Sequence, residues 1–289
     1  MASLRDIRKR IVSVRNMQQV TKAMKMVAAA KLRRAQDSIL RARPYAEKIE
    51  QVLGGVATRA DEEAHPLLQR RTPKRVELVV MTSDRGLCGA FNSNVLRRAQ
   101  RFLYENRDRY EHLQVSTIGK RGRDYFRKRQ IPSRRDYPGV FDALVYDQAK
   151  TLADELTAAY LENQLDAVFL LYNSFVSAIV QRPTLVQLLP IAAHPVAEDE
   201  KSRPVDYLYE PGRREVLDEL LPRHLAMQIW RALLESNAAE HAARMSAMEG
   251  ATKNSSEIID RLTLQYNRAR QASITTELVE IVSGAEALK

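Results

Sequence analysis

The sequence contains very little of what stabilises secreted proteins or anchors proteins in membranes. Its 289 residues include a single cysteine, Cys88, which excludes an internal disulfide and favours a reducing compartment. No uninterrupted apolar run approaches the roughly 20 residues that a membrane-spanning helix needs. Neither a secretory signal nor a Ser-rich transit leader precedes the first helix signal at Ser3. We therefore expect a protein that is neither secreted nor membrane-spanning.

Residues suited to catalysis or metal binding are also scarce. The five histidines show no ligand spacing, and no carboxylate pair is placed for acid–base chemistry. Cys88 has no motif that would supply a paired base. The segment Asp84–Asn92 carries Gly86 and Gly89 between an expected strand and helix, where nucleotide phosphates often dock. It matches neither GxGxxG nor GxxxxGK[ST], so a tight packing turn is favoured over a nucleotide site. We predict no catalytic residue, no cofactor and no metal site.

What the sequence does have is a long seam of apolar residues at alternating spacings of three and four, which is typical of a coiled coil. It runs from Leu4 to Val56, and 13 of its 16 positions are apolar. At 1.5 Å per residue this helix would be about 80 Å long and would need a partner helix. Ser3 and Asp6 resemble a capping box, and Pro44 is expected to bend the helix without ending it, because the spacing keeps its phase.

The three polar exceptions in this seam are adjacent, and a second apolar stripe runs beside them. Two interpretations stay open: a second partner supplied by another protein, or a locally widened core. The exceptions are Gln18, Thr21 and Lys25, and the stripe consists of Val14, Met17, Val20, Met24 and Val27.

Positive charge is concentrated in the same helix. The first 50 residues hold 13 Lys and Arg against 4 Asp and Glu, a charge of +9 out of a formal net charge of +10 for the chain. Such a helix suits an acidic partner, which could be nucleic acid, an anionic membrane surface or an acidic protein. A solvated basic face that binds nothing is the alternative.

The middle of the chain predicts an α/β domain with a mainly parallel sheet, because strands alternate with helices. A polar linker with prolines follows, and then a second long helix without strand signals. Residues 131–140 contain two prolines and are expected to be a loop. The expected strands are Val76–Met81, Val115–Gly119, Ala167–Tyr172 and Ser177–Leu189. The expected segments are the first helix (1–58), a connection (59–73), the α/β domain (74–193), the linker (194–212) and the last helix (213–289).

The last helix supplies the partner that the first helix needs. Its own seam continues past residue 250 through Ala251, Ser255, Ile258 and on to Val279. Because both helices leave the same α/β domain, they should pair antiparallel, with the two chain ends near one tip. The end of this helix has little polar surface and would aggregate without a partner. Its apolar residues are Ile274, Leu278, Val279, Ile281, Val282, Ala285, Ala287 and Leu288.

Four segments resemble the γ subunit family of F-type ATP synthases, in the right order and across the full length. The chloroplast regulatory segment with its cysteine pair is absent, so a bacterial version fits best. The fold implied is a long antiparallel coiled coil of N- and C-terminal helices plus a Rossmann-like α/β domain. The segments are Thr21–Leu32, Ser83–Gly89, Asp206–Pro211 and the most specific one, Ala269–Ala285.

The resemblance implies a non-catalytic central rotor shaft inside a ring of three α and three β subunits. Its base would rest on the c ring together with the ε subunit, coupling proton flow to conformational change at the β catalytic sites. Such a protein would be peripheral at the cytoplasmic face of the bacterial plasma membrane and would touch the membrane only through the c ring. By this resemblance, the candidate β contacts are Met24, Lys25, Arg270, Gln271, Thr275 and Glu277, and the candidate c ring or ε contacts are Tyr207 and Glu210.

Two other functions compete with this interpretation. A basic coiled-coil protein that binds nucleic acid would explain the charge of the first helix but not the apolar end of the last one. A nucleotide-dependent α/β enzyme with helical arms would need a phosphate-binding loop, which the sequence does not offer.

Overall fold

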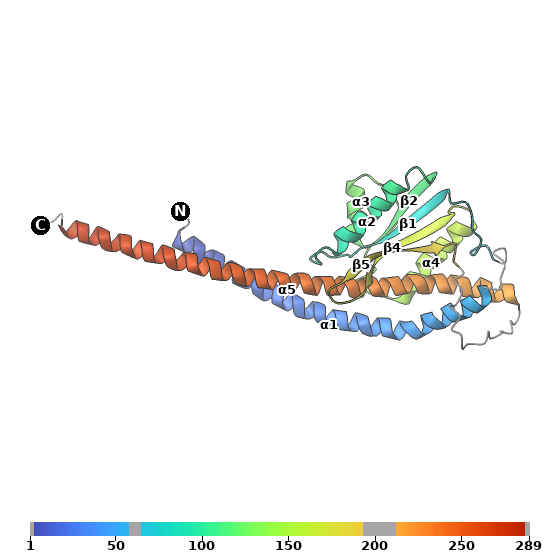
Figure 1. Ribbon diagram of the computed structural model, residues 1–289, viewed down its shortest axis with the longest axis horizontal. Helices are drawn as coiled ribbons and strands as arrows, with labels where there is room; N and C mark the ends of the chain where they lie inside the picture. The colour runs from blue at the N-terminus through green and yellow to red at the C-terminus, as the bar shows by residue number, and fades with distance from the viewer. Residues whose placement is uncertain (1–2, 58–64, 193–211, 287–289) are drawn as a thin grey trace. The chain divides into compact units, whose positions relative to one another are not determined.

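The computed structural model describes residues 3–57, 65–192 and 212–286 (Figure 1). It contains two compact units, which are Met1–Ala28 with Arg244–Lys289 (unit 1) and Ala29–Ala243 (unit 2). Two long helices, α1 (Leu4–Ala57) and α5 (Arg213–Glu286), contribute to both units. Over the described ranges, no helix combines the length and apolarity needed to cross a bilayer.

The first helix forms as its sequence pattern predicts. The backbone N–H of Asp6 donates to Ser3 Oγ at 3.2 Å, and Ser3 Oγ donates to the Asp6 carboxylate at 2.8 Å, so the two residues cap each other. Pro44 lies inside α1 and does not end it. Every seam position from Leu4 to Leu53 is buried or half-buried, which confirms the coiled-coil seam on this helix.

Unit 2 holds a five-stranded sheet in the order β3-β2-β1-β4-β5. The first four of these strands are mutually parallel, and β5 pairs antiparallel with β4, so the predicted mainly parallel sheet is confirmed. The strands are β1 (Arg75–Met81), β2 (His112–Ile118), β3 (Ser133–Tyr137), β4 (Ala167–Phe175) and β5 (Gln181–Leu189).

The strand β3 corrects the expectation of a loop at residues 131–140. Its sequence is polar and gives no buried-strand signal, because charged contacts rather than apolar packing hold it at the sheet edge. Arg134 Nε donates to the buried carboxylate of Glu77 at 2.7 Å, and Thr117 Oγ1 donates to Asp136 at 2.5 Å. An edge strand held by side-chain contacts is invisible to a search for apolar runs.

Helices cover both faces of the sheet, as the continuous burial of β1 from Val76 to Met81 requires (Figure 1). On one face Leu78 and Val80 pack against α2 (Phe91–Glu105) and α3 (Lys120–Lys128). On the other face Val79 and Met81 belong to a larger core that includes α4 (Tyr146–Leu161), the last turns of α1 and the first turns of α5. The sheet therefore anchors one end of each long helix.

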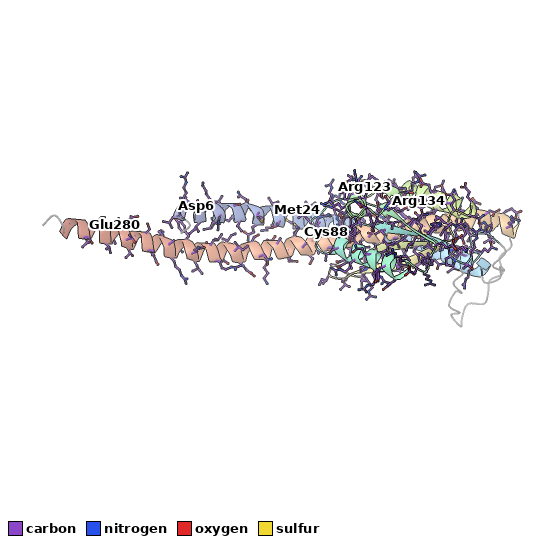
Figure 2. The ribbon with its side chains drawn as sticks, turned by 90° about the horizontal axis from the view of Figure 1, so that it is seen from above. Asp6, Met24, Cys88, Arg123, Arg134 and Glu280 are labelled. Carbon is purple, nitrogen blue, oxygen red and sulfur yellow. The ribbon has the colours of Figure 1, made fainter. Side chains whose placement is uncertain are left out.

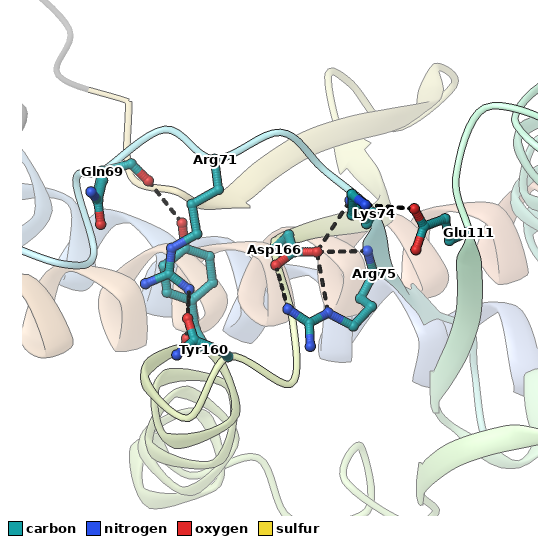
Figure 3. A network of polar contacts seen from close by, with 8 residues as sticks. Gln69, Arg71, Lys74, Arg75, Glu111, Tyr160 and Asp166 are labelled. Carbon is teal, nitrogen blue, oxygen red and sulfur yellow. Dashed lines mark hydrogen bonds and ion pairs between the residues drawn. The ribbon is translucent and has the colours of Figure 1, made fainter.

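A network of charged residues ties together the start of β1, the start of β2 and the turn before β4 (Figure 3). The Asp166 carboxylate accepts the backbone N–H groups of Lys74 and Arg75 at 3.1 and 2.8 Å and pairs with the Arg75 guanidinium at 2.9 Å. Lys74 Nζ pairs with Glu111 at 2.8 Å. Burial of Asp166 raises its pKa, but the hydrogen bonds and charge of Arg75 with the two amides outweigh burial, so the pKa is lowered.

We predict that Asp166→Asn destabilises the folded chain by about 1–2 kcal/mol at neutral pH, since charge-assisted bonds to a half-exposed arginine are lost. Because the folded-state pKa is lowered, the carboxylate stabilises the fold above its unfolded pKa of about 3.9 and loses that contribution as the pH falls through the folded value. Denaturant unfolding at several pH values should show a difference between the two proteins that shrinks below about pH 4. A difference independent of pH would contradict this account.

We also predict that Gly119→Ala lowers stability by about 1–3 kcal/mol, because the backbone there is left-handed and crowded. Gly119 has φ +94°, and a Cβ would lie 2.1 Å from the carbonyl oxygen of Thr82. The control is Gly250→Ala in α5, where a Cβ meets nothing within 4 Å and alanine should stabilise the helix by roughly 0.5–1 kcal/mol. Thermal unfolding followed by circular dichroism measures both effects, and equal behaviour of the two variants would refute the steric argument.

Candidate partner-binding surfaces

In unit 1 the helices α1 and α5 run antiparallel and touch through two polar pairs. Lys25 Nζ lies 2.6 Å from Glu249 Oε1, and the hydroxyl oxygens of Thr21 and Thr252 are 2.8 Å apart. A later residue on α1 thus meets an earlier one on α5. Extended at the helical rise per residue, this register places Leu4 opposite about residue 269 of α5. The antiparallel pairing expected from the sequence is therefore present.

One flank of α1 in unit 1 carries apolar side chains that the described residues leave uncovered. Met17, Val20 and Val27 are 56%, 57% and 56% exposed, and Met24 is half-buried. We call these four residues the α1 stripe. Within the described residues no widened core covers these side chains, which favours the interpretation of a surface for another protein over that of a widened core.

The last turns of α5 form a second apolar surface. Every described side chain from Ile274 to Ala285 is exposed, because α1 has no residue opposite this part of α5. At 3.6 residues per turn, its apolar residues share about half of the helix circumference, and Thr276, Glu277 and Glu280 lie on the other half. We call the apolar residues the α5 tip; they are Ile274, Leu278, Val279, Ile281 and Val282.

The seam predicted on α5 is only partly correct. Ala251 is half-buried and Ser255 is buried. Ile258, however, is 39% exposed, and its neighbour Ile259 is half-buried instead. Beyond about residue 270 the predicted positions, including Val279, are exposed. The physical reason is that a seam needs an opposite helix, and the register ends that opposition near Leu4.

The structure places the candidate β contacts in unit 1, in two groups. Met24, labelled in Figure 2, belongs to the α1 stripe, and Lys25 is a seam position of α1. The other four lie on α5 just before or within the tip and are exposed: Arg270, Gln271, Thr275 and Glu277.

Three of these six side chains already have polar partners within the chain. Lys25 forms the ion pair with Glu249, and Glu277 accepts a hydrogen bond from Ser273 Oγ at 3.1 Å. The Thr275 hydroxyl donates to the Gln271 carbonyl oxygen at 2.9 Å. The candidate c ring contacts Tyr207 and Glu210 lie outside the described residues.

Sequence reasoning did not single out three further exposed apolar residues, which lie outside the α1 stripe and the α5 tip. Val12, Met26 and Leu264 are 51%, 61% and 60% exposed in unit 1, and each is a large apolar residue away from the seam. A large apolar residue that lies off the seam of a coiled-coil helix was the sequence signal that could have identified them. Glu249 and Thr252 were missed as partners of the seam exceptions, because no pattern within one helix indicates which residue of the other lies opposite.

The glycine-containing segment Asp84–Asn92 is a packing turn. The Asp84 carboxylate accepts the N–H of Lys120 at 2.9 Å, at the start of α3, and that of Gly139 at 2.8 Å. An internal carboxylate thus occupies the position at strand ends where nucleotide-binding sheets hold a phosphate. Cys88 and Phe91 pack against Ala239 and Ala243 of α5. In the described ranges no group of three or more His, Cys, Asp or Glu has the geometry of a metal site.

Solved structures with this combination of long helices and an α/β domain define a class of protein, the central-stalk subunits of ATP synthases. A chain of the central stalk and c ring of Tetrahymena thermophila mitochondrial ATP synthase aligns with a TM-score of 0.61 and 25% identity, covering 80% of this chain and 99% of that one. A chain from Euglena gracilis mitochondrial ATP synthase aligns with a TM-score of 0.71 and 21% identity over 99% of this chain and 94% of its own, which supports the fold.

The sequence comparisons identify the family within this class. The family profile described as ATP synthase matches residues 3–288. The ATP synthase gamma chain of Anaeromyxobacter sp. (strain Fw109-5) is 61% identical over 292 residues, covering all of both chains, and that of Geobacter metallireducens is 51% identical over 289 residues with the same coverage. The chain belongs to the γ chain family, the central-stalk subunits of F1Fo ATP synthase.

We predict that the α5 tip makes the isolated chain self-associate. The double variant Leu278→Gln and Ile281→Gln should lower the apparent mass at micromolar concentration with no loss of helix content, because both side chains are more than half exposed, at 57% and 68%. The control is Leu40→Gln on α1, where a single exposed leucine of 62% exposure lies outside both surfaces. Sedimentation velocity measures the mass, and an equal change in both variants would count against a role of the tip.

Proposed function

We propose that this chain is the non-catalytic rotor shaft that couples proton flow through a c ring to conformational change at the β catalytic sites. Unit 1 would turn inside a ring of three α and three β subunits. The exposed α1 stripe and α5 tip support this proposal, because two apolar surfaces on one helix pair need a sleeve supplied by other chains. The relatives named ATP synthase gamma chain and the stalk subunits with this fold support it as well.

The helix pair can couple rotation to catalysis because it is asymmetric. The α1 stripe and the α5 tip lie on different helices and at different heights, so each β subunit of a three-fold ring would meet a different surface. Each β subunit is then biased toward a different nucleotide affinity, which is a coupling free energy between the shaft and the catalytic site. The bearing contacts are largely apolar and non-directional, so no single angle holds the shaft.

Polar residues near the tip would mark the preferred angles. Arg270 and Gln271 are exposed on α5 and would reach acidic or amide groups of a β subunit, together with Thr275 and Glu277. The positive charge of the first helix also favours binding to the β subunits. The first 50 residues carry 13 Lys and Arg against 4 Asp and Glu and would meet acidic loops. The ring contacts on α1 are Met24 and, through its exposed flank, Lys25.

The base of the shaft would bind the c ring and an ε subunit. By the family resemblance, Tyr207 and Glu210 are the contacts of this chain there. The bacterial relatives support a peripheral position at the cytoplasmic face of the plasma membrane, with membrane contact only through the c ring. The chain needs no cofactor of its own in this role.

Co-purification tests the proposal. The tagged full-length chain, expressed with the α, β and ε subunits of its own source, should elute as one complex that hydrolyses ATP. A chain that elutes without α and β would exclude the shaft. DNA binding that weakens steeply with salt would instead support the basic nucleic-acid-binding alternative.

We predict that Met24→Lys impairs coupling, because a new cation on the half-buried edge of the stripe would bind acidic groups of the ring and hold the shaft at one angle. ATP-driven proton pumping in inverted membrane vesicles should fall about two- to tenfold, equivalent to roughly 0.4–1.4 kcal/mol in the rate-limiting step. Met26→Lys is the matched control, since Met26 is 61% exposed and lies about 200° around the helix from Met24. Unchanged pumping by the Met24 variant would contradict the bearing role.

A further inference from the structure

Among the described residues of unit 1, Thr21, Lys25, Glu249 and Thr252 form a rung of cross-helix polar contacts, which we call the polar rung. The Lys25 ammonium lies 2.6 Å from the Glu249 carboxylate. One turn away on α1, Thr21 is 8% exposed, and its hydroxyl oxygen is 2.8 Å from that of Thr252. The rung thus combines a charged pair at the surface with a hydroxyl pair inside the seam.

The other described seam residues of unit 1 do not specify which turn of α5 lies opposite which turn of α1. Ile7 and Ile11 pack by apolar contact, which a shift of three or four residues would largely preserve, because both seams repeat at that spacing. Ser255 and Thr263 are polar but donate to carbonyl groups of their own helix, at 2.8 Å each. Such hydroxyls are satisfied in any register. The hydroxyls of Thr21 and Thr252 also lie 3.0 and 2.8 Å from carbonyl oxygens of their own helices, so the Lys25–Glu249 ion pair is the part of the rung that depends most on register.

We propose that the polar rung sets the register of the helix pair, and that Glu249 and Thr252 are positioning residues of the shaft. A shift by four residues would move α5 by about 6 Å along α1 and place Lys253 or Met245, in place of Glu249, opposite Lys25. Loss of the ion pair, or a lysine facing a lysine, disfavours the shifted registers, whereas the apolar contacts of the seam are largely kept. Directional contacts at one height therefore select one alignment among several with similar apolar packing.

The register matters because the two apolar surfaces lie on different helices. The α1 stripe and the α5 tip keep their axial offset only while the helices keep their alignment. In the proposed shaft this offset decides which β contacts engage at the same time, so the inference rests on the proposed function for its consequence. The register itself is a property of the chain alone.

Disulfide formation between paired cysteines measures the register in the full-length chain. The native-register pair is Ile11→Cys with Leu262→Cys, which the Thr21–Thr252 contact places opposite each other. The displaced-register pair is Ile11→Cys with Tyr266→Cys. The native Cys88 is buried in unit 2, whereas both pairs belong to unit 1. In the otherwise unchanged chain the native pair should form at least about tenfold faster, equivalent to roughly 1.4 kcal/mol.

Three sets of substitutions, each combined with the two cysteine pairs, test the polar rung. Lys25→Glu, which opposes two carboxylates, should reduce this preference at least about threefold. Thr21→Val with Thr252→Val should reduce it by less than Lys25→Glu does, with little change in thermal stability, because both hydroxyls also bond within their own helices and the valines still pack. The exchanged pair, Lys25→Glu with Glu249→Lys, should regain the preference of the unchanged chain. A rung that only adds general stability would not be restored selectively by exchanging the two charges.

The same variants, assembled with their α, β, ε and membrane subunits, connect register to function. Protons pumped per ATP hydrolysed should fall in Lys25→Glu and recover in the exchanged pair. An unchanged disulfide preference in Lys25→Glu, or no recovery in the exchanged pair, would overturn the proposal. So would a shifted register with unchanged pumping. A chain that does not assemble would contradict the proposed function, and the disulfide measurement would still decide the register.

Discussion

The structure depends on the burial of a narrow apolar seam between two antiparallel helices. A coiled coil buries only one stripe of each helix, and the seam of α1 is buried or half-buried from Leu4 to Leu53. The partner helix does not cover the apolar side chains that lie off the seam. The exposed residues of the α1 stripe and the α5 tip follow from that constraint, because a pair of helices has no further surface with which to cover them.

Unit 2 holds one end of each long helix in its core. The last turns of α1 and the first turns of α5 enter the same core as α4 and one face of the sheet, where Leu53 and Leu225 are buried. The opposite face of the sheet is closed by α2 and α3. The carboxylate of Asp84 satisfies backbone amides at the strand ends, which favours a structural role for this loop. Unit 2 thus packs the ends of both long helices into one core with the sheet.

Apolar and polar contacts have different roles in unit 1. Apolar contacts supply most of the free energy of association but do not distinguish one alignment from the next. The polar rung around Thr21 and Lys25 sets the register of the helix pair and adds little stability, as single polar positions set the register in other coiled coils. The proposed contact with the ring combines the same two kinds of contact. Its apolar surfaces would permit rotation, and a few polar side chains near Arg270 would favour particular rotation angles.

The sequence by itself determined both long helices, the seam of α1, the buried strands and the apolar α5 tip, because each depends on a local period or a continuous run. The tertiary structure alone decided that the charged segment Ser133–Tyr137 joins the sheet, since its stability comes from Glu77 and Thr117 and not from its own pattern. It also decided where the seam of α5 ends and that Lys25 meets Glu249, a partner 224 residues away. Periodicity records which face of a helix is buried, whereas only the packed chain determines what lies opposite.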